Sequence, residues 1–193
     1  MKKSGLLLLL SGFMLMIMSA AGLASQEFSA DMVSTTKQGT VTGKIYVSKD
    51  KTRTEMGSSI SISRMDKKVV WVLIPDKKMY MENELKPEQL PAMPEKMPGE
   101  VERTLIGPEK LDGRNVVKYK VTYTENKKKV VIWQWILPDT SFPVKTANED
   151  GSVTTEFKNL KNGKQPDSLF EIPAGYQKMS MGGMGNMLKN MFK

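Results

Sequence analysis

Short runs of alternating or β-branched residues, separated by turn residues, follow one another through most of the chain. A period of two between apolar and polar positions, or an accumulation of Val, Ile, Thr and aromatic residues, is typical of β-strands. The pattern predicts strands at 28–36, 40–48, 52–56, 60–65, 69–74, 78–82, 101–106, 115–124, 130–137, 142–148 and 152–160, with a last short segment at 168–172. Strands this short and closely spaced indicate a mainly β protein with a curled, antiparallel, barrel-like sheet.

Two of these strands, Val69–Ile74 and Val130–Leu137, have no polar face. An antiparallel strand with one face in water should alternate, so both faces of these two strands must be covered. Three covers are open: the sheet closes on its own side chains beneath a lid, the strands line an apolar ligand cavity, or they form a dimer interface. The candidate cavity-lining residues are Trp71, Leu73, Tyr119, Trp133, Trp135 and Leu137.

The segment 83–100 interrupts the strands with four prolines at spacings of three and four residues. Such spacing supports neither a strand ladder nor a long helix. Apolar residues lie between the prolines, whereas a flexible linker would be more polar. We therefore expect a Pro-rich flap, or short helical turns, that lids the apolar cavity through Leu90, Met93 and Met97.

The first residues carry the features of a cleavable export signal. Lys2 and Lys3 precede an uncharged apolar run, and small residues close the segment at Gly22-Leu23-Ala24. The apolar run is shorter than the ~20 residues that span a bilayer. We expect cleavage after Ala24, which gives a signal peptide at 1–24, a β domain at 25–178 and a tail at 179–193. The chain has no Cys, so no lipid anchor can be attached through an N-terminal Cys.

The absence of His and Cys excludes much chemistry. Neither a Ser-His nor a Cys-His pair can form, and the usual zinc sites have no ligands. The sequence shows no glycine-rich phosphate loop and no clustered acids. These features argue against an enzyme, and we expect no cofactor.

The chain is basic, with 29 Lys and Arg against 21 Asp and Glu, and its lysines gather in the predicted turns. Export argues against nucleic acid as a partner. Two interpretations of the lysines are open: they are solvated hairpin ends, or they attract anionic lipid headgroups and give a transient contact with the membrane surface.

The tail is rich in methionine and glycine. Thioethers are soft ligands for Cu(I), so a copper site is one interpretation of the tail. The others are a short helix with an apolar stripe and an unstructured end. The residues for the metal option are Met179, Met181, Met184 and Met187.

Four sequence segments resemble the LolA/LolB-like superfamily of periplasmic lipoprotein carriers and receptors, and in particular an uncharacterised branch of exported LolA-like proteins. They are EFSADM at Glu27–Met32, GKIYVSKDKTRTEM at Gly43–Met56, PDKKMYM at Pro75–Met81 and DSLFEIPAGYQKM at Asp167–Met179. The likeness covers residues 27–179. It implies an unclosed antiparallel barrel, a lidded cavity for acyl chains and a location in the periplasm of a Gram-negative bacterium.

In the carriers, an Arg on an early strand helps to hold the lid closed, and Arg53 is the matching position here. The alternative for Arg53 is an exposed residue near a turn. Taken together, the residues and the resemblance predict a non-catalytic periplasmic protein that binds a lipid or an acylated protein, with a role in lipoprotein or lipid trafficking. The alternatives are a structural or sensory envelope module that binds another protein, and Cu(I) binding by the tail.

Overall fold

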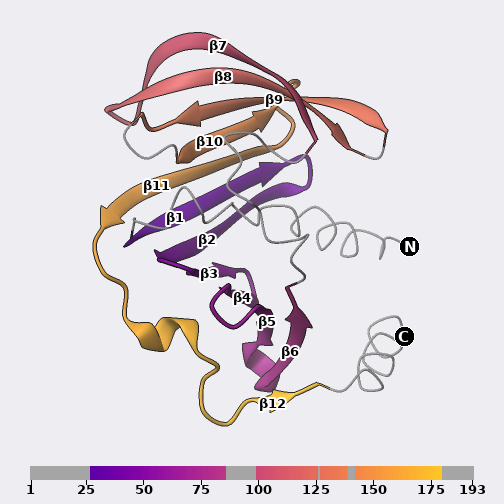
Figure 1. Cartoon of the computed structure of the whole chain (residues 1–193), viewed down its shortest axis with the longest axis vertical. Coiled ribbons are helices and arrows are strands. Elements are labelled where there is room, and N and C mark those ends of the chain that lie inside the picture. The colour runs from indigo at the N-terminus through magenta and orange to yellow at the C-terminus, as the bar shows by residue number, and fades with distance from the viewer. Residues whose placement is uncertain (1–26, 86–98, 126, 139–141, 180–193) are drawn as a thin grey trace.

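The structure, a computed structural model, describes residues 27–85, 99–125, 127–138 and 142–179, and these residues form one twelve-stranded sheet (Figure 1). Its strands are hydrogen-bonded in the order β12-β6-β5-β4-β3-β2-β1-β11-β10-β9-β8-β7. Since β12 and β7 are both edge strands, the sheet is unclosed. The predicted curled, mainly β architecture is confirmed. The signal peptide, flap residues 86–98 and tail residues 180–193 lie outside the described residues.

Each of the eleven strand ranges predicted between residues 28 and 160 is found as a strand of the sheet. The bounds are β1 (Glu27–Thr36), β2 (Gly39–Ser48), β3 (Lys51–Met56), β4 (Ser59–Arg64), β5 (Val69–Ile74), β6 (Met79–Glu84), β7 (Glu100–Leu111), β8 (Arg114–Glu125), β9 (Lys128–Ile136), β10 (Pro143–Asn148) and β11 (Thr154–Asn162). A short 3-10 turn, η1 (Pro75–Lys77), joins β5 to β6. The edge strand β7 runs further than predicted because a register shift between Leu105 and Gly107 lets it continue past Pro108.

The end of the described chain departs from the antiparallel pattern. The segment predicted at 168–172 is a 3-10 turn, η3 (Asp167–Phe170), followed by extended chain. The short β12 (Gln177–Lys178) then pairs in parallel with β6, opposite Met79 and Tyr80. We refer to residues 166–178 as the C-terminal strap. No helix in the described part of the chain is long and apolar enough to cross a membrane.

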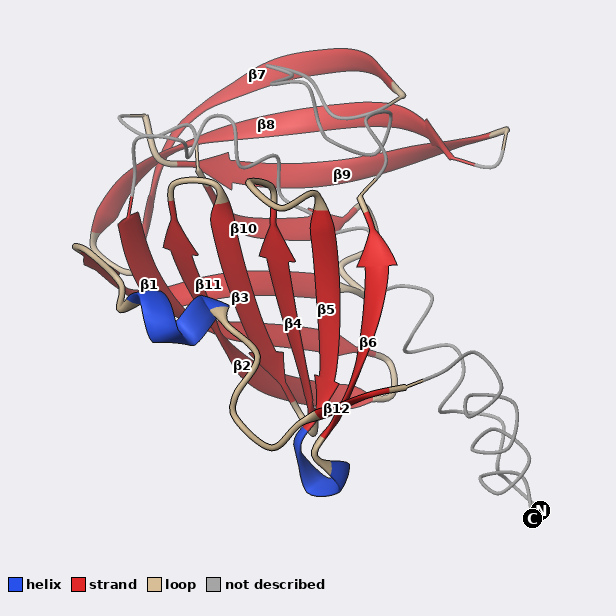
Figure 2. Cartoon of the chain, turned by 60° about the horizontal axis from the view of Figure 1, so that its bottom comes forward, coloured by secondary structure: helices blue, strands red, loops and turns tan. Residues whose placement is uncertain are grey.

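The sheet curls back on itself, so that β2–β6 form one layer and β7–β10 lie behind them (Figure 2). Its concave face, between the layers, holds the larger apolar cluster. Phe28, Met32, Ile45 and Phe157 are buried there, and the Phe142 ring lies 4.8 Å from the ring of Phe28. This inner cluster joins β1, β2, β10 and β11, the middle of the sheet.

A second apolar cluster lies on the convex face. Ile62, Trp71 and Leu73 of β4 and β5 pack there against Phe170 of the C-terminal strap. In both views η3 lies on the side of β3 and β4 that faces away from β8–β10 (Figures 1 and 2). The strap therefore covers the outside of the curled sheet, not its hollow side.

Candidate binding site

The two faces can be assigned residue by residue from the strand register. Directly opposite residues on neighbouring antiparallel strands point to the same side of a sheet. Trp71 lies opposite Ile62, Ile62 opposite Arg53, and the same side continues to Tyr46 on β2. All of these side chains share the convex face with the strap.

Trp71 and Leu73, two of the predicted cavity-lining residues, therefore belong to the outer cluster. Leu73 is fully buried and Trp71 is only 7% exposed. The Trp71 indole N–H donates to Glu82 Oε2 at 3.0 Å, and the Lys67 ammonium lies 5.2 Å from the Trp71 ring centre. The strap covers these side chains, so they do not line the concave face.

Trp133 and Trp135 share one side of β9, and Trp135 packs against the inner cluster. They lie opposite Lys120 and Lys118 on β8, whose ammonium groups lie 5.6 Å from the Trp133 ring centre and 4.8 Å from that of Trp135. Lys145 of β10 approaches Trp135 from the other side at 5.2 Å. Both indoles are half-buried under lysine side chains.

Tyr119 lies on the opposite face from Trp133 and Trp135, because its partner on β9 is Gln134. Leu137 follows the end of β9 and packs against the inner cluster. The six residues predicted to line one cavity are therefore divided between the two faces. Sequence alternation correctly grouped Trp133 with Trp135, but it could not tell which face is hollow.

The concave face carries its own set of apolar side chains beyond the inner cluster. They come from β5 and β6, they are half-buried, and they share the face of Ile45 by register through β4, β3 and β2: Val70, Val72, Ile74, Met79 and Met81. The fold leaves these side chains partly uncovered, and an apolar chain suits them better than a polar ligand.

A polar cluster lies near β7. The Arg103 guanidinium donates to both carboxylate oxygens of Glu100, at 2.9 and 2.8 Å, and to Gln134 Oε1 at 3.1 Å. It also lies 5.5 Å from the Tyr119 ring centre. Gln134 and the Glu100 side chain are buried, and burial raises the pKa of the nearby Tyr123 hydroxyl. Such a satisfied pair fixes β7 onto β8 and β9.

Arg53, the predicted lid residue, does hold a covering segment, but on the convex face. Its guanidinium donates to the Leu169 carbonyl oxygen at 3.0 Å and to Glu55 Oε1 at 2.7 Å. The segment it contacts is the C-terminal strap. The other predicted lid residues, Leu90, Met93 and Met97, lie outside the described residues.

Arg64 is a second clamp on the strap that the sequence reasoning missed. Its guanidinium, buried on β4, donates to the Phe170 carbonyl oxygen at 3.1 Å and pairs with Glu171 and Asp66. The hydrogen bonds from Arg64 hold the pKa of Asp66 below its usual range. Lys51 adds an outer ion pair to Asp167 at 2.8 Å. The sequence signal for this clamp is that Arg64 occupies the position after Ile60 and Ile62 in the Ile/Ser alternation of β4, on the same face as both.

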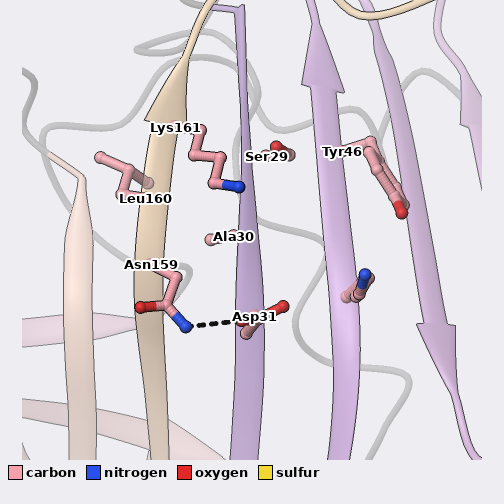
Figure 3. Close-up of a pocket in the computed structure, with 8 residues that line it drawn as sticks. Ser29, Ala30, Asp31, Tyr46, Asn159, Leu160 and Lys161 are labelled. Carbon is pink, nitrogen blue, oxygen red and sulfur yellow. Dashed lines mark hydrogen bonds between the residues drawn. The ribbon is translucent and has the colours of Figure 1, made fainter.

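A surface hollow of about 440 Å³ lies over β1, β2 and β11 (Figure 3). It forms where the register shifts between Ser29 and Asp31, and Asn159, in a left-handed conformation, donates from its side-chain amide to Asp31 Oδ2 at 2.7 Å. Lys44 and Lys161 also line it. These charged walls do not suit an acyl chain.

Comparison with known proteins places the fold. Residues 134–176 match a domain of unknown function, DUF4412, which spans the second half of β9, β10, β11 and most of the strap. No match is found among curated proteins. The match covers less than a quarter of the chain, so it does not establish membership of that family.

Among solved structures, MucB in the Pseudomonas aeruginosa MucA/MucB complex has a TM-score of 0.58 at 16% identity, covering 84% of this chain and 61% of that one. The chain thus spans about three fifths of that protein. LprF from Mycobacterium bovis has a TM-score of 0.43 at 12% identity, covering 82% of this chain and 94% of that one. A putative outer membrane lipoprotein-sorting protein domain from Vibrio parahaemolyticus has a TM-score of 0.32 at 12% identity, covering 75% and 89%. At 16% identity the likeness to MucB shows a shared fold and nothing further.

Met179 is the one residue of the metal option that the structure describes. Its backbone N–H donates to the Tyr80 carbonyl oxygen at 2.8 Å, which continues the pairing of β12 with β6. Met181, Met184 and Met187 lie outside the described residues, so the copper hypothesis stays a prediction.

Proposed function

We propose that this chain is an exported envelope protein that binds an apolar ligand, such as the acyl chain of a lipid or of an acylated protein, on its concave face. One observation carries the proposal: the concave-face side chains of β5 and β6 are apolar and only half-buried. Burying such surface against an acyl chain contributes about 25 cal/mol per Å². The lack of His and Cys supports binding in preference to catalysis.

The predicted export signal supports a location in the cell envelope, where acyl chains are available as ligands. The fold alone does not assign a cargo, so a role in lipoprotein or lipid trafficking rests on the concave face.

The test is uptake of a fluorescent fatty acid, together with native mass spectrometry of protein purified from its own envelope. Two valines form a matched pair: Val72→Glu places a charge on the concave face of β5, and Val33→Glu places it on the opposite face of β1 at a similarly half-buried position. We expect Val72→Glu to lower fatty-acid affinity by at least about tenfold and Val33→Glu to leave it unchanged. Val72→Ser serves as a milder second variant if Val72→Glu unfolds the protein.

A clean ligand-free mass, together with no fatty-acid uptake by the unsubstituted protein, would rule the proposal out. Equal loss in Val72→Glu and Val33→Glu would also contradict it, because the concave face would then have no special role.

A second candidate is a module that uses the fold to bind another protein. The observation that favours it is the likeness to MucB, whose structures include a complex with MucA. Two results together would favour this candidate: the unsubstituted protein has no lipid affinity, and a protein partner co-purifies with it but not with Val72→Glu.

A further inference from the structure

The edge strand β7 exposes more large apolar side chains than the rest of the described sheet. Four large hydrophobic residues are strongly exposed among the described residues, and three of them lie on β7: Val101 at 62%, Leu105 at 61% and Ile106 at 50%. We refer to these three residues as the β7 lip. The fourth, Val153, lies between β10 and β11.

The β7 lip arises from two irregularities in the strand. Glu100 and Glu102 lie opposite consecutive residues of β8, so Val101 is an extra residue between them. Ile106 is the extra residue between Leu105 and Gly107 in the same way. Such bulges turn side chains out of the regular ladder. The two bulged residues of this edge are thus both aliphatic and both point away from the packed sheet.

The same irregularities make β7 a poor template for another strand. Bulges twist an edge away from a flat partner, and Pro108 removes one backbone donor. Strand addition by a protein partner therefore fits this edge badly. Insertion of side chains into an apolar medium requires no backbone pairing and fits it well.

The surroundings of the β7 lip are basic. Residues 99–138 contain eight Lys and Arg against five Asp and Glu. Lys118 and Lys120 lie on β8 opposite Gly107 and Thr104 of β7, and the exposed Lys127–Lys129 turn lies at the Val101 end of the strand. Positive charge beside exposed aliphatic side chains is complementary to an anionic lipid surface.

Two tryptophans lie near this edge. Trp133 and Trp135 are half-buried and share the face of Lys118 and Lys120, whereas Leu105 lies opposite Tyr119 on the other face, so the two sets meet at the edge of the sheet. Indoles with adjacent lysines are suited to the boundary between headgroups and acyl chains.

We propose that the β7 lip, with the lysines and tryptophans of β8 and β9 beside it, docks this protein on an anionic membrane surface. The aliphatic side chains enter the boundary of the acyl region, and the lysines contact the headgroups. This docking is independent of a ligand on the concave face, but it would bring the open edge of the sheet next to the source of such a ligand.

The test is co-sedimentation of the full exported protein with vesicles of phosphatidylcholine alone and with about 30% phosphatidylglycerol, at about 0.05 M and about 0.5 M salt. We expect binding to the anionic vesicles that weakens steeply with salt. The double variant Leu105→Glu/Ile106→Glu should lose about tenfold or more in partitioning, because it removes inserted apolar area and adds repulsion. The matched control Val153→Glu places one charge on the other exposed aliphatic position and should change partitioning less than about twofold.

Several outcomes would overturn the proposal: no binding of the unsubstituted protein to anionic vesicles at low salt, equal loss in Val153→Glu, or binding that salt does not change. A dimer in solution that Leu105→Glu/Ile106→Glu converts to a monomer would also overturn it, because the β7 lip would then be an interface between copies. Circular dichroism of each variant checks folding, and Leu105→Ser/Ile106→Ser removes the apolar side chains without adding charge. Fatty-acid uptake measured without vesicles tests the concave face separately, so each proposal can fail without affecting the test of the other.

Discussion

The strands β5 and β9 look alike in sequence, yet the fold covers their tryptophans in different ways. In β5, Trp71 and Leu73 lie beneath a separate segment of chain, and Trp71 is nearly excluded from solvent. In β9, Trp133 and Trp135 lie beneath lysine side chains of their neighbouring strands and stay half-exposed. The strap seals β5, whereas the indoles of β9 are covered by lysine side chains and, at Trp135, partly by the inner cluster.

The comparison shows what a doubly apolar strand indicates. It requires cover on both faces, but it does not identify the cover. The aliphatic stem of a lysine can shield an indole while its ammonium stays in water. A packed aromatic residue such as Phe170 excludes water completely. Cover by lysine side chains leaves the surface accessible to a ligand, whereas cover by Phe170 makes the surface part of the packed core.

Removing the Phe170 side chain, which anchors the strap, should lower stability more than any other substitution considered below. Phe170 is fully buried against Ile62, Trp71 and Leu73, so Phe170→Ala leaves a cavity there. We expect the free energy of unfolding to fall by about 3–5 kcal/mol. Urea denaturation followed by circular dichroism measures the loss, and tryptophan emission should shift to the red as Trp71 meets water. The strap would not be a stabilising layer if Phe170→Ala lost less than Val153→Ala, its exposed counterpart.

The next effect comes from the clamp. Arg64→Gln removes the donor to the Phe170 carbonyl oxygen, leaves Asp66 without its ion-pair partner and leaves Glu171 paired with Lys67 alone. A buried group that loses its partner costs about 1–3 kcal/mol, and Glu171 is half-exposed, so the lower half of that range applies. Urea denaturation again gives the loss. Lys51→Gln, which removes an ion pair at the exposed Asp167, is the control and should change stability by less than about 0.5 kcal/mol.

The same clamp predicts a dependence on pH. The pKa of Asp66 lies below its ordinary 3.8 because Arg64 donates to it. Burial acts to raise the pKa of Glu171, but hydrogen bonds from Arg64 and Lys67 outweigh burial and lower it below 4.5. Carboxylates with lowered pKa values in the folded state bind protons less readily than in the unfolded state. Their stabilisation is therefore complete above about pH 4.5 and is lost as the pH falls through the lowered values.

Unfolding free energies measured between about pH 7 and about pH 3 test this dependence. Glu171→Gln should lower stability at neutral pH and flatten the decline toward acid. An unchanged slope in Glu171→Gln would show that the acid sensitivity comes from other carboxylates.

The sequence was sufficient for the strands but not for their faces. Period-two alternation predicted that Trp133 and Trp135 share a side, because alternation is local. Whether that side becomes the concave face depends on how the whole sheet curls, and the sequence of a single strand does not determine the curl. Tyr119 was therefore grouped with the wrong neighbours, since its own face becomes clear only from its register with Gln134.

The strap shows a second limit. Arg53 was matched to a lid-holding residue, and it does hold a covering segment, but its partner Leu169 lies 116 positions away in the sequence. Phe170 is one aromatic residue in a short polar stretch with no periodicity to mark it as buried. The contact forms only because the sheet brings β3 and β4 beneath the returning chain. The family likeness marked Arg53 as a residue that holds a covering segment, which the local sequence pattern could not show.

The smallest predicted effect concerns the lysine cover on β9. Lys118 lies 5.1 Å from the Trp133 ring centre and 4.8 Å from that of Trp135, and it also pairs with Glu109 at 3.1 Å. Lys118→Ala removes both its charge and its stem and should lower the unfolding free energy by about 1 kcal/mol. Lys118→Met keeps most of the stem and should lose about half as much. If the aliphatic stem provides the cover, acrylamide should quench the tryptophans of Lys118→Ala more than those of Lys118→Met. Equal quenching in the two variants would mean that the ammonium, and not the stem, holds the indoles in place. The cover of β9 would then rest on a cation–π interaction, whereas that of β5 rests on apolar packing.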